Sequence, residues 1–263
     1  MIVHLDGDLI VYRAGFAAEK MHYYLIQKDE EYEDDVAKHF QYQKDLKKYI
    51  TDHELEEKDY TIEARREVEP LKNALYNVKS LIKDCLDHLE AGEDELIVYL
   101  SGPDNYRNGV ATLKPYKGNR DKQHRPVHAD AIKQFMQKRY NVVMSVNEEA
   151  DDVVGYSHYK MWLEDEHSSV IATVDKDIDM IPGMHYNFVK EKAYYVTPDT
   201  ADWYFLRQLL TGESTDNIPG VPGIGNVKAE AALGLAEDNV WDAIVALYVQ
   251  GYGDNWYDAL VEN

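Results

Sequence analysis

Carboxylates follow four short apolar segments of the chain, each within four residues of the segment's end. Continuous apolar segments of this length are typical of buried parallel strands, whose carboxyl ends meet at one edge of an α/β sheet. We therefore expect carboxylates that are far apart in the sequence to gather at that edge. The segments and the carboxylates after them are MIVHL with Asp6, ELIVYL with Asp104, NVVMSV with Glu148 and Glu149, and SSVIATV with Asp175.

More carboxylates adjoin or follow these positions, in the stretches EADD, DKD and GESTDN. A single Asp or Glu is more often a helix cap or a turn former than a ligand, but so many like charges at one edge would repel each other strongly. Bound cations remove that conflict, and oxygen ligands without His or Cys favour Mg²⁺ or Mn²⁺ over zinc. Two such ions about 4 Å apart catalyse in-line displacement at phosphorus. The added carboxylates are Asp151, Asp152, Asp177, Glu213 and Asp216.

The distribution of charge qualifies the strongly acidic composition. A net charge of −21 argues against a nucleic-acid partner. However, nine basic residues and only two acidic ones lie between Arg107 and Arg139. Within this segment, YKGNR offers an aromatic ring for a base, with the ammonium of Lys117 and the guanidinium of Arg120 for a phosphate. The basic segment therefore predicts that the acidic site acts on a phosphodiester.

Alternating strand and helix patterns predict an α/β fold with a mostly parallel central sheet flanked by helices. A helical repeat of apolar residues from Pro70 to Leu89 predicts the helix that joins the first two strands. The acidic stretch 19–69 is predicted to be an exposed helical insertion. We expect a catalytic domain over 1–198 and a helical lobe over 199–263. The helices of that lobe are expected at 199–211, 226–233 and 240–249.

Cysteine usage and hydropathy indicate the compartment. The single cysteine, Cys85, can form no disulfide within the chain, which predicts a reducing cytoplasm. The sequence opens on a strand-like segment instead of a basic and then apolar leader, and no apolar run has the length of a membrane span. We therefore expect a soluble intracellular protein without a membrane partner.

The stretch GESTDNIPGVPGIG, residues 212–225, has too many Gly and Pro residues for a helix interior and predicts a shaped loop with an exposed backbone. Together with DGDLIVYR, YKGNRDKQHRP, EADD and DKD, it resembles the 5′-nuclease superfamily, in which these motifs occur in the same order. That superfamily includes flap endonucleases, the 5′-nuclease domain of bacterial DNA polymerase I and phage 5′–3′ exonucleases. LDGDLIVYRAG and TADWYFLRQLLTGE are most similar to the phage branch.

The resemblance implies a PIN-like 5′-nuclease fold and a 5′–3′ exonuclease that uses two Mg²⁺ or Mn²⁺ ions. Its substrate would be DNA, or the RNA of an RNA–DNA hybrid, with a 5′ end at a duplex terminus, nick, gap or flap. A phage-encoded protein of this kind would work in the cytoplasm of the infected bacterial host cell.

The resemblance also implies roles for individual residues. The first metal would be held by Asp6, Asp104, Glu149, Asp151 and Asp152, and the second by Asp175, Asp177, Glu213 and Asp216. The residues that would contact DNA are Lys117 and Arg120 at the reacting phosphate, Tyr116 on the terminal base, Arg13 on the 5′ strand, and Lys122 and Arg125 in a groove for the duplex end.

The segment GVPGIG is similar to the turn of the superfamily's helix–hairpin–helix motif, which holds duplex DNA by its phosphates. Gly220, Gly223 and Gly225 would let amide N–H groups approach a phosphate at the start of the helix that begins near Asn226. Lys228 would add a charged contact. In relatives the turn's carbonyl groups also enclose a K⁺ ion, so the resemblance implies a K⁺ site here.

Three departures from the superfamily pattern leave alternatives open. Glu213 stands where relatives usually have Asp, and Gln208 stands where some have a basic residue. The stretch 120–147 has room for one helix but not for a full helical arch that threads a single strand, which favours an exonuclease. The alternatives are a structure-specific flap endonuclease, a PIN-type ribonuclease and a non-catalytic, structure-specific DNA-binding protein.

Overall fold

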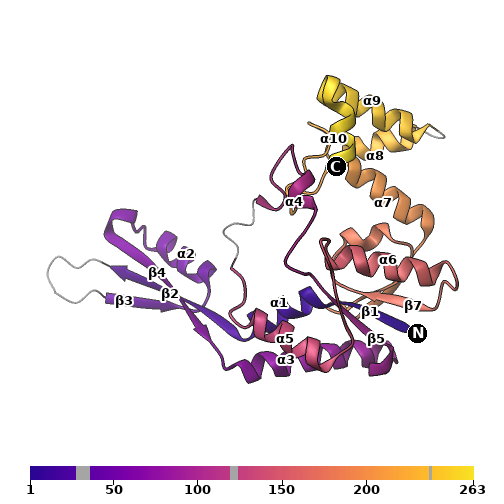
Figure 1. The fold of residues 1–263 in the computed structure, drawn as a ribbon. Coiled ribbons are helices and arrows are strands. Elements are labelled where there is room, and N and C mark those ends of the chain that lie inside the picture. Colours follow the sequence, from indigo (N-terminus) through magenta and orange to yellow (C-terminus); the bar gives the residue numbers. More distant parts are fainter. Residues whose placement is uncertain (28–35, 119–123, 237–238) are drawn as a thin grey trace. The chain divides into compact units, whose positions relative to one another are not determined.

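The computed structural model describes residues 1–27, 36–118, 124–236 and 239–263, which form two compact units (Figure 1). The first unit comprises 1–10, 81–124 and 136–263, and the second comprises 11–80 and 125–135. Each unit is described by itself. The domain boundary near residue 198 that the sequence suggests is a different division and stays a prediction. Among the described residues, no helix has both the length and the apolar character needed to cross a bilayer.

A six-stranded sheet forms the centre of the first unit, with the strand order β6-β5-β1-β7-β8-β9. Every neighbouring pair is parallel except β8 and β9, which confirms the predicted mostly parallel sheet. Leu5 lies opposite Val98 on one side and Ala172 on the other, so the carboxyl ends of β1, β5 and β7 are level. The strands are β1 Ile2–Asp6, β5 Leu96–Leu100, β6 Val142–Met144, β7 Ser169–Ala172, β8 Gly183–Asn187 and β9 Lys192–Val196.

Helix α6 (Ala150–Trp162) contacts β1, β5 and β7, and its residues Ala150 and Val154 pack with Tyr99 and Ile171 in a buried cluster. The short helix α4 (Arg107–Val110) follows β5, and the 3₁₀ turn η4 (Asp177–Met180) follows β7. Three further helices carry residues of both units: α1 Gly7–Ala17, α3 Leu71–His88 and α5 Ala129–Arg139. Helix α3 confirms the helix predicted between the first two strands.

Four helices follow the sheet and enclose a second buried cluster that includes Leu210, Val221, Ile244 and Tyr248. The first of them begins after Thr197, whose hydroxyl accepts a hydrogen bond from the amide of Thr200 at 3.2 Å, a common N-cap arrangement. Three of the helices were predicted, and the last was not. The helices are α7 Pro198–Thr211, α8 Asn226–Leu235, α9 Val240–Tyr252 and α10 Trp256–Glu262.

The described part of the stretch 19–69, in the second unit, forms an antiparallel sheet in the order β3-β2-β4 with the α-helix α2, so the prediction of a helical insertion is wrong. Strand β2 carries Leu25, which is fully buried, and α2 carries the buried Leu46. Because charged residues such as Lys20 and Glu67 pair across the strands, their polarity hides the period-two pattern of these strands. The elements are β2 Glu19–Gln27, β3 Val36–Phe40, α2 Gln43–Asp52 and β4 Tyr60–Val68.

Candidate active site

Asp6 is the last residue of β1 and is only 3% exposed. One of its carboxylate oxygens accepts a hydrogen bond from the backbone N–H of Leu9 at 3.1 Å, and the other accepts one from the hydroxyl of Thr173 at 3.0 Å. The same hydroxyl accepts a hydrogen bond from the amide of Asp175 at 3.1 Å. Thr173 therefore links the carboxyl ends of β1 and β7 and fixes the orientation of Asp6.

The carboxylates at this edge raise one another's pKa values. Burial, with the negative charges of Asp8 and Asp175, raises the pKa of Asp6 to about 7. Burial, followed by repulsion from Asp6 and Asp175, raises the pKa of Asp151 to about 8. Burial and repulsion from Asp175 and neighbouring carboxylates raise the pKa of Asp177 to about 6. The predicted gathering of distant carboxylates is therefore present for these residues.

This cluster of oxygen donors has the chemistry that Mg²⁺ prefers, because a dication would offset the mutual repulsion. Among the described residues, no three His, Cys, Asp or Glu side chains are placed so that they would hold a metal ion as they stand. Mg²⁺ retains several of its waters in many protein sites and is bound through one or two carboxylates. The cluster therefore fits a hydrated Mg²⁺ ion better than a fully protein-ligated site.

The N-terminus of α6 contributes three carboxylates, of which Glu149 is the N-cap residue. The backbone N–H of Glu149 donates to Asp152 at 3.1 Å. Arg107, from α4, donates two parallel hydrogen bonds to Asp152 at 2.6 and 2.8 Å, and its Nη1 lies 3.5 Å from Glu149. Burial opposes ionisation of Asp152, but the hydrogen bonds and charge of Arg107, the backbone N–H of Glu149 and the charge of Lys117 together outweigh it, so the pKa of Asp152 is lowered. Asp151 is repelled by the neighbouring carboxylates, whereas the negative charge of Asp152 is balanced by Arg107.

Tyr116 and Lys117 lie against the same carboxylates. The hydroxyl oxygen of Tyr116 lies 2.5 Å from a carboxylate oxygen of Glu149 and 2.9 Å from one of Asp216, so its single proton is within reach of both. Burial and the hydrogen bond to Glu149 raise the pKa of Tyr116, so its hydroxyl stays protonated. The ammonium of Lys117 forms an ion pair with Glu149 and lies 3.8 Å from Asp216. This arrangement brings a lysine and a tyrosine to carboxylates from two separate elements.

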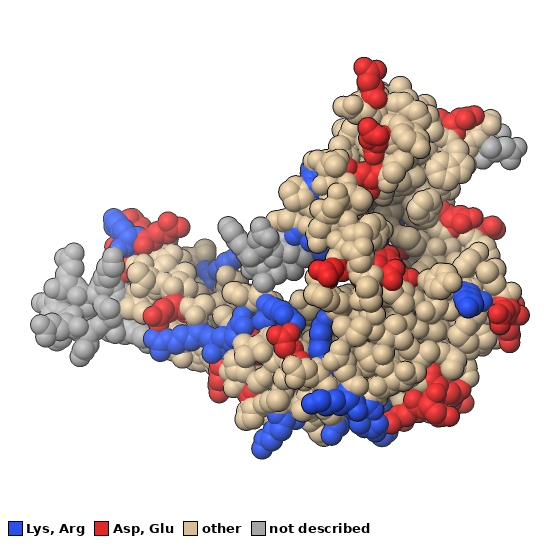
Figure 2. Space-filling view, in the orientation of Figure 1, with Lys and Arg blue, Asp and Glu red and all other residues tan. Residues whose placement is uncertain are grey.

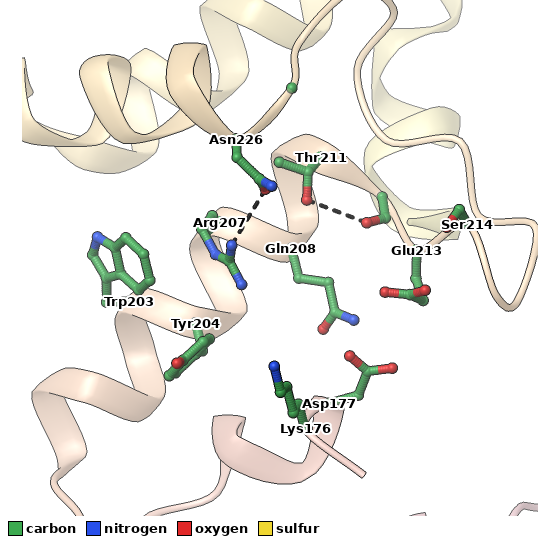
Figure 3. Close-up of a pocket in the computed structure, with 12 residues that line it drawn as sticks. Lys176, Asp177, Trp203, Tyr204, Arg207, Gln208, Thr211, Glu213, Ser214 and Asn226 are labelled. Carbon is green, nitrogen blue, oxygen red and sulfur yellow. Dashed lines mark hydrogen bonds between the residues drawn. The ribbon is translucent and has the colours of Figure 1, made fainter.

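The loop after α7 supplies Glu213 and Asp216, both of which raise the pKa of Asp177. Glu213 and Ile218 form an antiparallel bridge, with N···O distances of 3.0 and 2.8 Å. A carboxylate oxygen of Glu213 also accepts a hydrogen bond from the amide of Thr215 at 2.8 Å. Beside Asp177 and Glu213 lies a cavity of about 590 Å³, which Figure 3 shows with its lining side chains.

The turn between α7 and α8 contains the three glycines predicted to approach a phosphate. Gly220 and Gly223 have φ angles of +57° and +76°, in the region that favours glycine. A Cβ atom on Gly220 would lie 2.2 Å from the backbone nitrogen of Gly212. Gly225 is the N-cap residue of α8, with φ −105°. Lys228 donates to the carbonyl oxygen of Gly223 at 2.8 Å, so its ammonium lies on the turn itself.

The remaining predicted residues lie on an exposed segment of the first unit, in the second unit, or outside the described part of the chain. Asp104 is exposed on the segment after β5. Arg13 and Arg125 belong to the second unit, where Arg125 forms an ion pair with Asp130. Arg120 and Lys122 lie outside the described residues.

Two residues at the site were not predicted to act there. Arg107 opens the basic segment, and its position shortly after a strand that leads to a carboxylate was the available signal. Thr173 directly follows β7, and its place at the end of a buried strand was the signal in the sequence that could have identified it as a site residue. Over the C-terminal helices the visible charged side chains are mainly acidic (Figure 2), and the sequence has no basic residue after Lys228.

Sequence comparison with known proteins finds similarity to nucleases. The chain is 27% identical over 164 residues to a 5′-3′ exonuclease of Buchnera aphidicola subsp. Schizaphis graminum, covering 58% of this chain and 56% of that one. It is 29% identical over 116 residues to an exodeoxyribonuclease of Enterobacteria phage T3, covering 42% and 38%. These relatives confirm the resemblance to the 5′-nuclease superfamily that the motifs indicate.

No family model matches the chain. The match spans about half or less of the length of the two curated relatives. A solved structure of T5 5′-exonuclease, described as having divalent metal ions (zinc) bound, covers 99% of this chain and 93% of its own, with 14% identity and a TM-score of 0.52. That similarity confirms the 5′-nuclease fold.

Proposed function

We propose that the chain is a divalent-metal-dependent 5′–3′ exonuclease that hydrolyses phosphodiester bonds of DNA from a 5′ end. The observation that carries the proposal is the mutually repelling set of the buried Asp6 and the half-buried Asp151 and Asp175 at the carboxyl edge of the sheet. Lys117, paired with Glu149, supplies a cation beside that set. The names of the curated relatives, a 5′-3′ exonuclease and an exodeoxyribonuclease, support the same activity.

The site is proposed to hold two Mg²⁺ or Mn²⁺ ions, which when bound would supply an activated water and stabilise the leaving oxygen. The chain's own residues position the substrate. Lys117 would turn from Glu149 to the reacting phosphate, where its charge acts most strongly in the transition state. Tyr116 would keep Glu149 and Asp216 at a fixed separation through its hydroxyl. The proposed ligands are Asp6, Asp104, Glu149, Asp151 and Asp152 for one ion and Asp175, Asp177, Glu213 and Asp216 for the other.

The turn between α7 and α8 is proposed to grip duplex DNA by its phosphates, with a K⁺ ion at its carbonyl groups. Its positive-φ glycines and the N-terminus of α8 support this role. The substrate is proposed to be a recessed, blunt or nicked 5′ end, and an RNA–DNA hybrid is a second substrate to test. Binding through phosphates predicts a strong dependence of affinity on salt concentration.

Digestion of 5′-labelled duplex, 5′-flap and RNA–DNA substrates, each with Mg²⁺ and with EDTA, tests the proposal. We expect stepwise release of short products from duplex ends with Mg²⁺ and no cleavage in EDTA. The Asp151→Asn variant serves as the matched control and is expected to bind DNA without cutting it. Cleavage that persists in EDTA would refute the metal-dependent mechanism.

A flap whose 5′ end carries a bulky protein separates the two nuclease alternatives. An exonuclease that needs a free end does not cut this substrate. Release of the intact flap despite the block would instead identify a structure-specific endonuclease. DNA binding without cleavage of any substrate, at any Mg²⁺ or Mn²⁺ concentration, would favour the non-catalytic alternative.

A further inference from the structure

The cavity of about 590 Å³ in the first unit is lined by η4, α7 and the start of α8 (Figure 3). Its two ends differ in charge. Asp177 and Glu213 lie at one end, next to the carboxylate cluster. Arg207 and Lys176 reach into the other part of the cavity, and Figure 3 shows both side chains directed toward the same space. The cationic end is not used by the roles proposed above.

The guanidinium of Arg207 is held in place by three neighbours. Its central carbon lies 5.1 Å from the ring centre of Trp203 and 5.3 Å from that of Tyr204. Its Nη1 donates a hydrogen bond to Oδ1 of Asn226 at 3.2 Å. Its Nε is buried and has no hydrogen-bond partner among the described residues. A fixed guanidinium with donors to spare is preorganised to bind an oxyanion in a bidentate manner.

Two further features favour an anion in this space. Lys176 precedes η4 and adds a second, exposed positive charge. Helix α8 is 10 residues long, and its N-cap residue Gly225 and first residue Asn226 line the cavity, so the positive end of the helix dipole faces it. The side chain of Gln208, which also lines the cavity, is hydrogen-bonded to Asp177.

We propose that the cavity is a subsite for one backbone phosphate of the DNA strand that is cut, with Arg207 as the bidentate donor and Lys176 as the second charge. The inference rests on the proposed function, because it assigns the occupant as part of that substrate. A phosphodiester chain suits the cavity because one phosphate would meet the cationic end while the neighbouring one lay by Asp177 and Glu213. The aromatic rings of Trp203 and Tyr204 would exclude water from the contact.

Binding measured in EDTA tests the subsite without cleavage. A series of identical duplexes is prepared in which one phosphate near the 5′ end is replaced by a neutral methylphosphonate, at a different position in each. We expect one position to weaken wild-type binding about tenfold or more, because a charge-assisted hydrogen bond is lost. The Arg207→Gln variant should bind unmodified DNA more weakly by a similar factor. The methylphosphonate at that position should weaken the binding of Arg207→Gln no further. The variant's slope of log affinity against log salt concentration should fall in magnitude by about 0.9.

Two variants serve as controls. Lys192→Gln removes an exposed charge from β9 of the same unit and should keep the wild-type response to every methylphosphonate. Arg207→Lys keeps the charge without the planar fork and should recover the salt slope but only part of the affinity. Thermal melts of all variants show whether the fold is retained. A merely structural role for Arg207 would not single out one phosphate.

The outcomes distinguish the inference from the proposed function. If every methylphosphonate weakens Arg207→Gln as much as the wild type, the subsite does not exist, and the nuclease proposal is unaffected. If one position is selected by Arg207 but no substrate is cleaved with Mg²⁺, the subsite stands and the nuclease proposal fails. If the wild type binds no DNA, both are overturned.

Discussion

Replacing Asp151 with Asn should stabilise the metal-free protein while abolishing cleavage. An Asp carboxyl ordinarily ionises near pH 3.8, but burial and repulsion from Asp6 and Asp175 keep Asp151 protonated in the folded state up to about pH 8. Between these two values the folded state binds more protons than the unfolded state, so the free energy of unfolding decreases as pH rises. Each pH unit costs about 1.4 kcal/mol, which amounts to a cost on the order of 4 kcal/mol at pH 7.

Asparagine keeps the volume of the side chain but has no proton to lose, so it avoids this cost. For a chain of 263 residues, about 2–4 °C of Tm accompanies each kcal/mol, and the expected gain at pH 7 is roughly 10 °C. Thermal melts in EDTA from pH 4 to pH 8 measure it. The gain should be near zero at pH 4 and largest near pH 8, and added Mg²⁺ should stabilise the wild type more than the variant. A variant that is less stable than the wild type at pH 7 in EDTA would refute the assignment of Asp151 to a repulsive cluster.

Three further predictions concern single side chains of the first unit. Lys117→Ala should lower the single-turnover cleavage rate about a hundredfold or more, and should reduce the DNA affinity measured in EDTA much less. Equal losses of rate and of affinity would show that Lys117 only binds the DNA. Burial lowers the pKa of His158 to about 4 from its ordinary 6.5, so the unfolded state binds more protons at this group in that window. The contribution of His158 to the free energy of unfolding should therefore fall by about 3 kcal/mol as pH drops from 6.5 to 4. Denaturant titrations of His158→Gln should show a smaller loss over this range, and an unchanged loss would contradict the assignment. Gly220→Ala should lower Tm far more than Gly225→Ala, because a Cβ at Gly220 meets backbone at 2.2 Å and φ is +57°, whereas nothing lies within 4 Å of a Cβ at Gly225. Equal melting temperatures would show that the turn relaxes.

The part of the site that lies at strand ends was predictable because a simple rule governs it. Asp6 ends β1 and Asp175 lies shortly after the end of β7, and parallel pairing brings those strand ends to the same edge of the sheet. Glu149 and Asp151 follow the same rule through the start of α6. The contacts of Arg107 were not predictable, because they depend on the path of the chain between β5 and α4. No periodic pattern sets that path.

The sheet of the second unit was missed for a different reason. Residue Glu19 pairs with Val68, nearly fifty positions away, so no local pattern reveals the partner strand. The many exposed charged residues of these strands led to the prediction of solvent-exposed helices. By contrast, Trp203 and Arg207 are four residues apart on a predicted helix, and this spacing alone indicates that the ring and the guanidinium are neighbours. That signal was available in the sequence.

The ion pair between Lys117 and Glu149 would couple the binding of metal to the binding of DNA. While the ammonium rests on Glu149, it occupies the same carboxylate that a dication would use. A DNA phosphate that draws Lys117 away releases that carboxylate, so substrate binding should raise the affinity for metal. Thermodynamic reciprocity then requires metal to raise the affinity for substrate by the same factor. In such a protein Lys117 would compete with metal for Glu149 until DNA is bound, so metal alone would bind weakly and the site would be completed only when both ligands are present.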